Sequence, residues 1–470
     1  MPFAIGGNQL DTGYEVSNSA RMNSSETFTK TISSTTSRNT FTISTWLKRS
    51  STSGNGGIFG VGTASSDTGR FFLRFTSSDK LAATGGATNF RISNAVFRDV
   101  SAFYHIVCVF DSTNATAQNR LRLYVNGVEI TSWSTNNTVN SSQNTPVNES
   151  GKTHVVGGDG DNSSAKFSGY LAEFNFIDGQ AKAPTDFGEF DDNGVWIPKK
   201  YNGTYTNNSF FLEFQNSGSL GNDTSGLGNN YTANNFNTVD QTTDTPTNNF
   251  ATINAVSNYY ASAILSEGNT KLVTDGAAYT YSVSSIGVSA GKWYMEDKIG
   301  AGINNWFGVG IAEGESSNAS GVLGRDTYFP AGNEYGQIGW FGYGTDFVYQ
   351  NDGYYSGSTS DYDTDGYTTN DILGIALDAD NNNVKFYKNG TVQNSGNAFT
   401  LGSSSTGFWH FAFGDYDGQN AHFHTHNLNF GNPAFSISSG NSDANGYGNF
   451  EYAVPSGYYA LCTKNLAEFG

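Results

Sequence analysis

The chain has 470 residues, of which 36% are hydrophobic and 14% aromatic, and its formal net charge is −18 at pH 7. This acidic balance argues against nucleic acid and disfavours anionic lipid as partners, because both need a basic contact surface, and no run of about 18 apolar residues is present to insert into a membrane. Aromatic residues combined with 57 Gly and only 8 Pro are typical of short strands joined by tight turns.

Strand patterns dominate the first half of the chain. Each candidate strand alternates apolar and polar residues, or is apolar throughout a short span, and is bounded by Gly, Asn, Ser or Asp. A short helical turn is predicted in APTDFGEF (183–190). The clearest strand candidates are TFTISTWLKR (40–49), GRFFLRFTS (69–77), FYHIVCVFD (103–111), RLRLYVNG (120–127) and GYLAEFNFIDG (169–179).

Residues 216–250 differ from the strands on either side. The stretch contains almost no large aliphatic residues and is rich in Gly, Asn and Thr, which predicts a linker between two domains. The alternative is an irregular loop that carries a strand and packs on the edge of a sandwich.

Strand patterns resume in the second half. In GKWYMEDKI, Glu296 and Asp297 are expected on opposite faces of one strand, since side chains alternate. The candidates are GKWYMEDKI (291–299), NWFGVGIAE (305–313), YGQIGWFGYG (335–344), DILGIALDAD (371–380), VKFYKNG (384–390), GFWHFAFGD (407–415) and AHFHTHNLNF (421–430).

One phrase occurs twice. RLYVNGVEI (122–130) and KFYKNGTVQ (385–393) both place a tyrosine two residues before Asn-Gly. Asn-Gly between apolar runs is a strong hairpin signal, because both central residues of a type I′ turn need positive φ. In each half an apolar strand that contains an aspartate near its end, Asp111 or Asp378, precedes the hairpin. The sequence therefore predicts an all-β protein with two tandem antiparallel β-sandwiches.

These motifs also resemble known families. NTFTISTWLKRS (39–50), LRLYVNG (121–127) and FSGYLAEFNFIDG (167–179) resemble a laminin-G-like, concanavalin A-type jelly roll. SIGVSAGKWYMEDKI (285–299) and DILGIALDADNNNVKFYKNG (371–390) resemble a SPRY domain. The resemblance implies a jelly roll (16–215) and a SPRY-like sandwich (251–455) on either side of the linker (216–250). Residues 1–15, which carry little pattern, are expected to form an N-terminal arm, and residues 456–470 a C-terminal tail.

The combination of these domains, followed by PSGYYALCTKNL (455–466), is similar to virion-associated proteins of tailed phages. The resemblance implies a non-enzymatic tail fibre, appendage or capsid decoration that contacts other virion proteins and a host-surface glycan, with a homotrimer expected by analogy. A purely structural decoration is the first alternative. With no signal-peptide pattern and only Cys108 and Cys462, synthesis in a reducing host cytoplasm before assembly into the virion is expected.

A glycan-degrading enzyme is the second alternative, because laminarinase-type hydrolases share the jelly-roll fold. They place carboxylates about 5–5.5 Å apart through a Glu-x-Asp-x-x-Glu pattern. The nearest match is EFDDNG, in which Glu189 and Asp191 fit but Gly194 stands in place of the second glutamate. No catalytic residue is therefore assigned.

Histidines form one candidate metal site. His422, His424 and His426 alternate, so a strand would display them on one face about 6.6–7 Å apart. They are candidates for a transition-metal site within the chain or on a trimer axis. The alternative is a polar or partly buried sheet face, because Leu428 and Phe430 share it.

Acidic residues form a second candidate metal site. DYDTDGYTTND (361–371) places Asp361, Asp363 and Asp365 before a glycine, as a calcium loop does, but Ile372 replaces the glutamate that an EF-hand needs at the twelfth position. Ca²⁺ is thus the candidate cofactor, and a solvated loop is the alternative. GDGDN (158–162) is a weaker candidate.

Aromatic residues suggest where a glycan could bind. Residues 328–355 mix Tyr, Trp and Phe with Gly and Asn, and exposed rings can stack on sugar faces. Part of this region must be sheet core, since neighbouring Trp340 and Phe341 point to opposite faces. The candidate glycan-binding residues are Tyr354, Tyr355, Tyr343 and Trp340.

Overall fold

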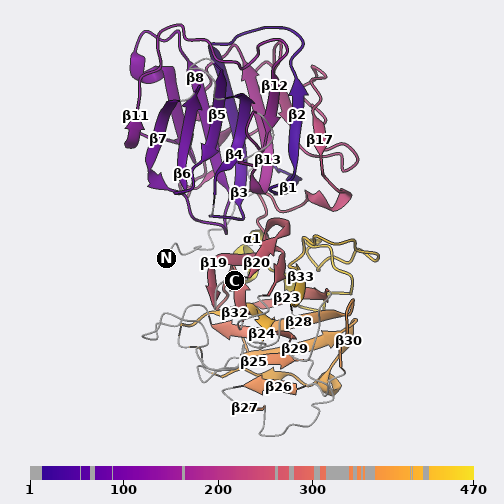
Figure 1. Ribbon diagram of the computed structural model, residues 1–470. Coiled ribbons are helices and arrows are strands. Elements are labelled where there is room, and N and C mark those ends of the chain that lie inside the picture. The colour runs from indigo at the N-terminus through magenta and orange to yellow at the C-terminus, as the bar shows by residue number, and fades with distance from the viewer. Residues whose placement is uncertain are drawn as a thin grey trace. The chain divides into compact units, whose positions relative to one another are not determined.

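The computed structural model divides the described chain into two compact units that meet at the Asn249–Phe250 bond, and each unit is described by itself below (Figure 1). The first unit is Gln9–Asn249 and the second is Phe250–Gly470. The structure describes residues 13–52, 54–63, 69–86, 88–160, 165–259, 263–274, 280–300, 307–313, 338–341, 347–350, 353–354, 366–402, 404, 406–415 and 423–470.

The first unit is a sandwich of two antiparallel sheets. Sheet I has the order β10 (Val128–Glu129), β9 (Leu121–Val125), β8 (Tyr104–Asp111), β3 (Thr40–Arg49), β13 (Ser168–Asp178), β1 (Ser19–Asn23) and β18 (Gln241–Thr242), and β16 (Phe210–Leu212) also pairs with β13. Sheet II has the order β11 (Trp133–Asn136), β7 (Thr88–Val96), β6 (Lys80–Gly85), β5 (Arg70–Phe75), β4 (Gly56–Gly62), β12 (Thr153–Val156), β2 (Thr27–Thr31) and β17 (Thr232–Asn234). A separate hairpin joins β14 (Gly188–Phe190) to β15 (Trp196–Pro198).

The second unit is also a two-sheet sandwich. Sheet III has the order β30 (Thr391–Val392), β29 (Asn383–Lys388), β28 (Ile372–Asp378), β23 (Lys292–Ile299), β33 (Thr425–Asn429), β21 (Lys271–Val273) and β20 (Ile264–Ser266), with β31 (Phe399–Thr400) on β29 and β34 (Tyr459–Ala460) parallel to β23. Sheet IV has the order β27 (Gly353–Tyr354), β26 (Phe347–Gln350), β25 (Ile338–Phe341), β24 (Phe307–Glu313), β32 (Trp409–Asp415), β22 (Thr280–Ser284) and β19 (Ile253–Tyr259).

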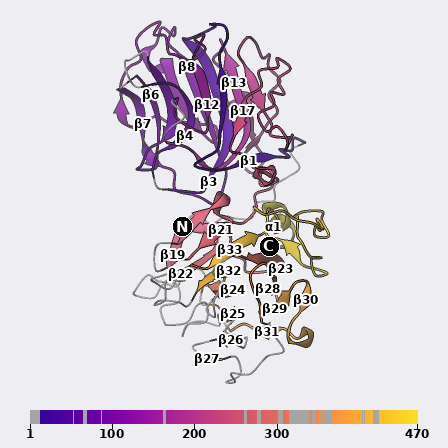
Figure 2. The same cartoon turned by 45° about the vertical axis from the view of Figure 1, so that its right-hand side comes forward.

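The two sandwiches share one strand order. Each of the strands β1–β10, β12 and β13 of the first unit has a counterpart at the same place in the sheets of the second unit. The number of the counterpart is larger by 20, so that β3 corresponds to β23 and β13 to β33 (Figure 2). The register agrees as well, because Thr40 pairs with Asp111 in the first unit and Lys292 pairs with Asp378 in the second. The repeated phrase therefore marks equivalent parts of two like-folded units.

The Asn-Gly hairpins have the same hydrogen bonds in both units. The side-chain oxygen of Asn126 accepts the backbone N–H of His105 at 2.7 Å, and the side-chain oxygen of Asn389 accepts the backbone N–H of Ile372 at 2.8 Å. Both asparagines have positive φ, +49° and +48°, and so do the glycines that follow. The predicted type I′ hairpins are confirmed, and each turn also binds the first residues of the neighbouring strand.

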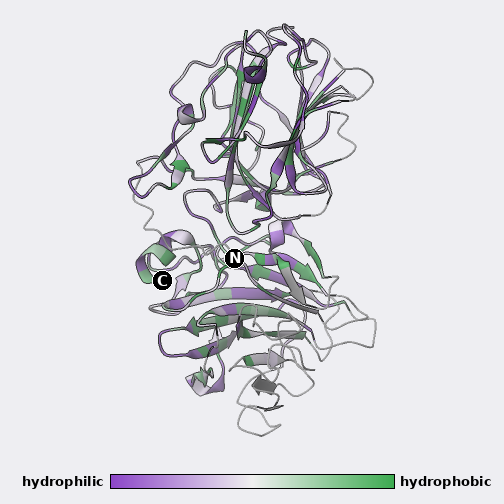
Figure 3. Ribbon diagram, turned by 90° about the vertical axis from the view of Figure 1, so that its left-hand side faces the viewer, coloured by the Kyte–Doolittle hydropathy of each residue, from purple (hydrophilic) through white to green (hydrophobic). Residues whose placement is uncertain are grey.

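Each unit has its own hydrophobic core between its sheets. Phe41, Phe59, Phe110 and Phe176 are among the buried rings of the first core, and Trp293 is buried in the second. Hydrophobic residues gather on the strands of both units in Figure 3. The predicted all-β fold of two antiparallel sandwiches is confirmed.

The linker predicted for residues 216–250 is wrong. These residues contribute β17 and β18 to the sheets of the first unit, and the side chains of Leu220 and Tyr231 are buried in its core. The segment is instead an irregular loop that carries strands and packs on the edges of the sandwich, which was the alternative for these residues. The sequence concealed this because only these few large apolar side chains anchor a long polar segment.

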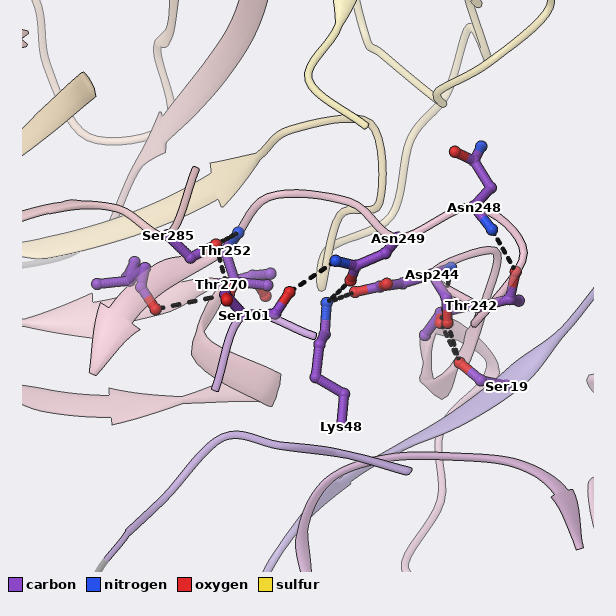
Figure 4. A network of polar contacts seen from close by, with 12 residues as sticks. Ser19, Lys48, Ser101, Thr242, Asp244, Asn248, Asn249, Thr252, Thr270 and Ser285 are labelled. Atoms are coloured by element: carbon purple, nitrogen blue, oxygen red, sulfur yellow. Dashed lines mark hydrogen bonds and ion pairs between the residues drawn. The ribbon is translucent and has the colours of Figure 1, made fainter. Parts of the chain in front are cut away.

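A buried ion pair also ties this segment to sheet I. The Lys48 ammonium contacts the Asp244 carboxylate and donates to the Asn249 side chain at 2.8 Å (Figure 4). The ammonium lies 4.8 Å from the centre of the Tyr170 ring, and the side chains of Lys48 and Asp244 are 1% and 0% exposed. The last residues before the unit boundary are thus fixed from within the first unit.

The C-terminal residues 456–470, expected as a tail, are folded into the second unit. The strand β34 pairs with β23, and the helix α1 (Thr463–Phe469) brings the Phe469 ring to 3.9 Å from the ring of Tyr459, measured between centres. The helical turn predicted in 183–190 is confirmed as a short 3₁₀ turn, Pro184–Asp186.

The hairpin glycines provide a test of the fold. A Cβ on Gly127 would lie 2.5 Å from ring atoms of Trp196, whereas Gly151, which has a similar positive φ, has no heavy atom within 4 Å of that position. We expect Gly151→Ala to lower the free energy of unfolding by about 1–2 kcal/mol through its φ and Gly127→Ala to lose a further 1–3 kcal/mol, roughly, through the clash.

Urea unfolding of the full chain measures both changes. Gly390 and Gly457 offer the same comparison in the second unit, because a Cβ on Gly390 would lie 2.6 Å from the Tyr452 ring while Gly457 has open space. Equal losses within either pair would contradict the proposed packing.

The buried ion pair provides a second test. Lys48→Met leaves the Asp244 carboxylate buried without its cation, and such a loss costs about 3–5 kcal/mol of stability. We expect the double variant Lys48→Met with Asp244→Asn to lose less than the sum of the single losses, as measured in a double-mutant cycle of urea unfolding. The exposed Lys152→Met is the control, with a change of about 0.5 kcal/mol or less.

Candidate functional site

The structure describes two of the four predicted glycan-binding residues. Trp340 lies in β25 with its side chain fully buried in the second core, so its assignment to a binding surface is wrong. Its ring packs 5.1 Å from that of Tyr367. Tyr354 lies in β27, opposite Tyr349. Tyr343 and Tyr355 lie outside the described residues, and their role stays a prediction.

The two described histidines of the predicted metal site are buried. His424 Nδ1 lies 3.0 Å from Asp415 Oδ2, and His426 Nδ1 lies 2.5 Å from Asp297 Oδ2. The second nitrogen of His426 faces the carbonyl oxygen of Gly414 at 3.1 Å. Each ring is thus directed to its own partners inside the core, which corrects the expectation that these two rings face a shared metal position.

The remaining metal candidates fall elsewhere. His422, Asp361, Asp363 and Asp365 lie outside the described residues, so calcium stays a prediction. Within the part of the chain that the structure describes, no cluster of three His, Cys, Asp or Glu side chains could hold a metal ion. In GDGDN (158–162), the weaker calcium candidate, Asp159 forms an ion pair with Arg70.

The chain covers the outer face of sheet I with its own residues. Tyr14 donates a hydrogen bond to the Glu173 carboxylate at 2.5 Å, and Tyr205 donates to the side chain of Asn175 at 2.5 Å. Burial raises the pKa of Glu173 to about 7, and this residue has φ +50° where β13 bulges. Since Tyr14 belongs to the arm predicted for 1–15, the described end of that arm is part of the first unit.

A Ser–His pair lies beneath this cover. The Nε2 of His105 is 2.8 Å from Ser44 Oγ, and Trp196 Nε1 donates to His105 Nδ1 at 3.0 Å. Burial lowers the pKa of His105 to about 3, so the ring is neutral. Because Nδ1 accepts from an indole, the ring proton is on Nε2 and donates to Ser44. His105 therefore cannot take a proton from this serine.

The carboxylates nearest to a hydrolase pattern lie in the β14–β15 hairpin. Glu189 is exposed and forms an ion pair with Lys199 at 3.2 Å. Asp191 accepts the backbone N–H groups of Asn193 and Val195, which closes the hairpin turn. Asp191 thus stabilises the hairpin turn, and Glu189 forms a surface ion pair. The two carboxylates do not face a common cleft.

A polar hollow of about 490 Å³ opens at one end of the first sandwich. Three chain segments meet there: the β1–β2 turn, the β3–β4 loop and the residues leading into β13. Its volume lies in the range of roughly 300–1,000 Å³ that small-molecule sites occupy. The polar side chains of its lining are Ser24, Ser25, Arg49, Ser51, Asn55, Lys166 and Ser168.

Hydrogen bonds between the three segments hold the hollow in shape. The N–H of Ser24 donates to the carbonyl of Phe167 at 3.0 Å, and the ammonium of Lys166 donates to the carbonyl of Ser25 at 3.2 Å. Ser24 and Ser168 are joined through their hydroxyl groups, and the N–H of Ser50, where the β3–β4 loop begins, donates to the carbonyl of Ser168 at 3.1 Å. The lining thus combines four serine hydroxyls, the Asn55 amide and the Lys166 ammonium, while the side chain of Arg49 is 3% exposed and paired with Asp79. Such groups suit a polyhydroxylated ligand.

Sequence reasoning missed this hollow. Its residues come from three turns that are far apart in the chain, and each turn resembles many other Ser-, Gly- and Asn-rich stretches. The available sequence signal was that Lys166 directly follows a glycine- and serine-rich stretch. This signal is too weak to identify a binding site.

Comparison with known proteins agrees with this architecture. Residues 22–184, about a third of the chain, match the family model described as the concanavalin A-like lectin/glucanases superfamily. No curated protein sequence matches the chain. That superfamily contains both lectins and glucanases, so the match defines the fold of the first unit and leaves open which activity it carries.

Several solved structures are similar to parts of the chain. The SPRY domain of human HERC1 is 15% identical, with coverage of 37% of this chain and 96% of that domain, and a TM-score of 0.28. A heptameric SAP-like pentraxin from Limulus polyphemus is 14% identical, with coverage of 36% and 80% and a TM-score of 0.27. A candidate carbohydrate-binding protein from Bacteroides ovatus is 14% identical, with coverage of 47% and 58% and a TM-score of 0.28.

Among the helices of the described residues, none has the length and apolar character to cross a membrane.

The neutral histidines of the first unit predict acid sensitivity. Burial lowers the pKa of both His105 and His154 to about 3. Below pH 6.5 the unfolded chain takes up protons that the folded unit does not, so stability is lost as the pH falls, by about 1.4 kcal/mol per pH unit for each histidine. His105→Gln should reduce the loss between pH 6.5 and 5 by about 2 kcal/mol.

Urea unfolding at the two pH values measures this difference. His154→Gln is the matched variant with the same expected reduction. If neither substitution changes the pH dependence, the neutral buried state of these rings is contradicted.

Proposed function

We propose that this chain is a non-enzymatic protein of a phage virion, a tail fibre, appendage or capsid decoration, whose first unit binds a host-surface glycan in the polar hollow. The observation that carries the binding function is the hollow itself: an opening of ligand size, lined by four serines, an asparagine and two cations, at the end of a concanavalin A-like sandwich.

The contacts beneath the cover support a binding role over a catalytic one. A serine nucleophile needs a neighbouring base that accepts its proton, and His105 instead donates to Ser44. The nearest candidate acid, Glu189, is on the surface and paired with Lys199. Both arrangements favour a lectin-like function for the first unit.

The location on a virion rests on the sequence resemblance to virion-associated proteins of tailed phages. Two like-folded sandwiches in one chain suit the display of binding surfaces, and a homotrimer that contacts other virion proteins follows by the same analogy. Electron microscopy of intact particles labelled with an antibody against the chain tests this location, and its absence from particles would overturn it.

Glycan binding is tested with the purified full chain on a glycan array. We expect binding that Asn55→Ala combined with Ser51→Ala weakens at least tenfold, because hydrogen bonds to sugar hydroxyls are lost at about 1 kcal/mol or more each. Lys152→Ala, on the surface of the same unit, is the control and should bind as the unaltered chain does.

Two other outcomes are informative. Release of products from a labelled polysaccharide would replace the proposed function with a glycan-degrading one. No binding to any glycan, by a folded chain that is found on particles, would favour a purely structural decoration.

A further inference from the structure

Positive charge gathers around the polar hollow, although the chain as a whole carries −18. Lys166 and Arg49 belong to the lining, and Arg74 donates a hydrogen bond to the side chain of Asn55 from the neighbouring strand β5. Arg70 lies on the same face of β5, because residues 70, 72 and 74 alternate with the core residues between them.

The carboxylates near this cluster are already engaged. Asp79 is shared by Arg49 and Arg98, at 3.0 and 2.8 Å, and Asp159 pairs with Arg70. Glu26 accepts the hydroxyl of Ser25. Among the described residues, neither Arg74 nor Lys166 forms an ion pair, so the described cations near the opening outnumber the described carboxylates.

The arginines are held in place by an aromatic ring. The guanidinium carbons of Arg70 and Arg74 lie 4.5 and 5.6 Å from the centre of the buried Phe72 ring. Burial lowers the pKa of Arg74, and the charge of Arg70 lowers it further. Asp159 balances the charge of Arg70, whereas Arg74 donates only to the neutral side chain of Asn55, so a further anion near Asn55 would be stabilised by Arg74.

Long-range repulsion does not cancel this local attraction. At physiological salt, charges separated by more than about 8 Å of solvent are largely screened. An anionic group that enters the hollow would respond mainly to the nearby cations, whereas the acidic remainder of the surface would discourage binding elsewhere.

We propose that the glycan bound in the hollow carries a negatively charged substituent, a carboxylate or a sulfate, which Lys166 contacts and which the arginines beyond Asn55 attract. Serine hydroxyls and Asn55 bind the neutral hydroxyls of the same sugar. This inference rests on the proposed glycan-binding function and adds the chemical class of the ligand.

The test compares matched sugars on the full chain by isothermal titration calorimetry. The pairs are dextran with dextran sulfate and fully methyl-esterified oligogalacturonate with free oligogalacturonate, so that each anionic sugar has a neutral counterpart of the same backbone. We expect at least one anionic member to bind roughly tenfold more tightly than its counterpart, because hydrogen bonds to charged groups are stronger than those between neutral groups. The preferred pair tells sulfate from carboxylate recognition.

Substitutions identify the responsible cation. Lys166→Gln keeps a donor toward the Ser25 carbonyl but removes the charge, and should erase the preference for the anionic sugar while leaving the neutral one within about twofold. Lys166→Arg should keep the preference, and circular dichroism checks that both variants are folded. A rising salt concentration should weaken the binding of the anionic sugar and leave the binding of the neutral sugar unchanged.

The results separate this inference from the function beneath it. If neutral and anionic sugars bind equally tightly and Asn55→Ala abolishes the binding of both, the charge inference is overturned. The proposal that the hollow binds a glycan is then still supported. If no sugar of either kind binds, glycan binding in the hollow fails as well.

Discussion

In each unit a segment of the chain lies across the outer face of the sheet that contains the Asn-Gly hairpin, and the contacts beneath that segment decide which surfaces are left for function. In the first unit the Trp196 ring packs on Gly127 and donates to His105. In the second, Glu296 accepts the backbone N–H groups of Glu451 and Tyr452 at 2.9 and 2.8 Å. With these sheet faces covered, the opening at the end of the first sandwich is the candidate site among the residues that the structure describes.

The strands and hairpins were predictable because their signals are local. The stretch 40–49 is β3 from end to end, and Asn-Gly adopts the positive φ values that its residue types favour. The alternation in GKWYMEDKI also held, since Glu296 faces the covering segment and Asp297 faces the core. The role of residues 216–250 was missed because their attachment depends on partners nearly 200 residues away, such as Lys48 for Asp244.

The candidate site was far less predictable, because burial is a property of the assembled sheets. Alternation correctly placed His424 and His426 on one face. It could not reveal that they form hydrogen bonds with Asp415 and Asp297 inside the core. Likewise, a strand containing Trp340 has two faces, and the sequence does not say which of them meets the other sheet. The hollow is formed by turns whose composition is common throughout the chain.

The pairing of β1 has a consequence for how the protein is made. Ala20 in β1 pairs with Leu171 in β13 and with Gln241 in β18, so β1 leaves the ribosome well before either of its neighbours. At a synthesis rate of about 5–20 residues per second, β1 waits roughly 10–45 s with exposed edges. A second unit with the same strand order then follows on the same chain, which makes exchange of equivalent strands between units the characteristic risk during its production.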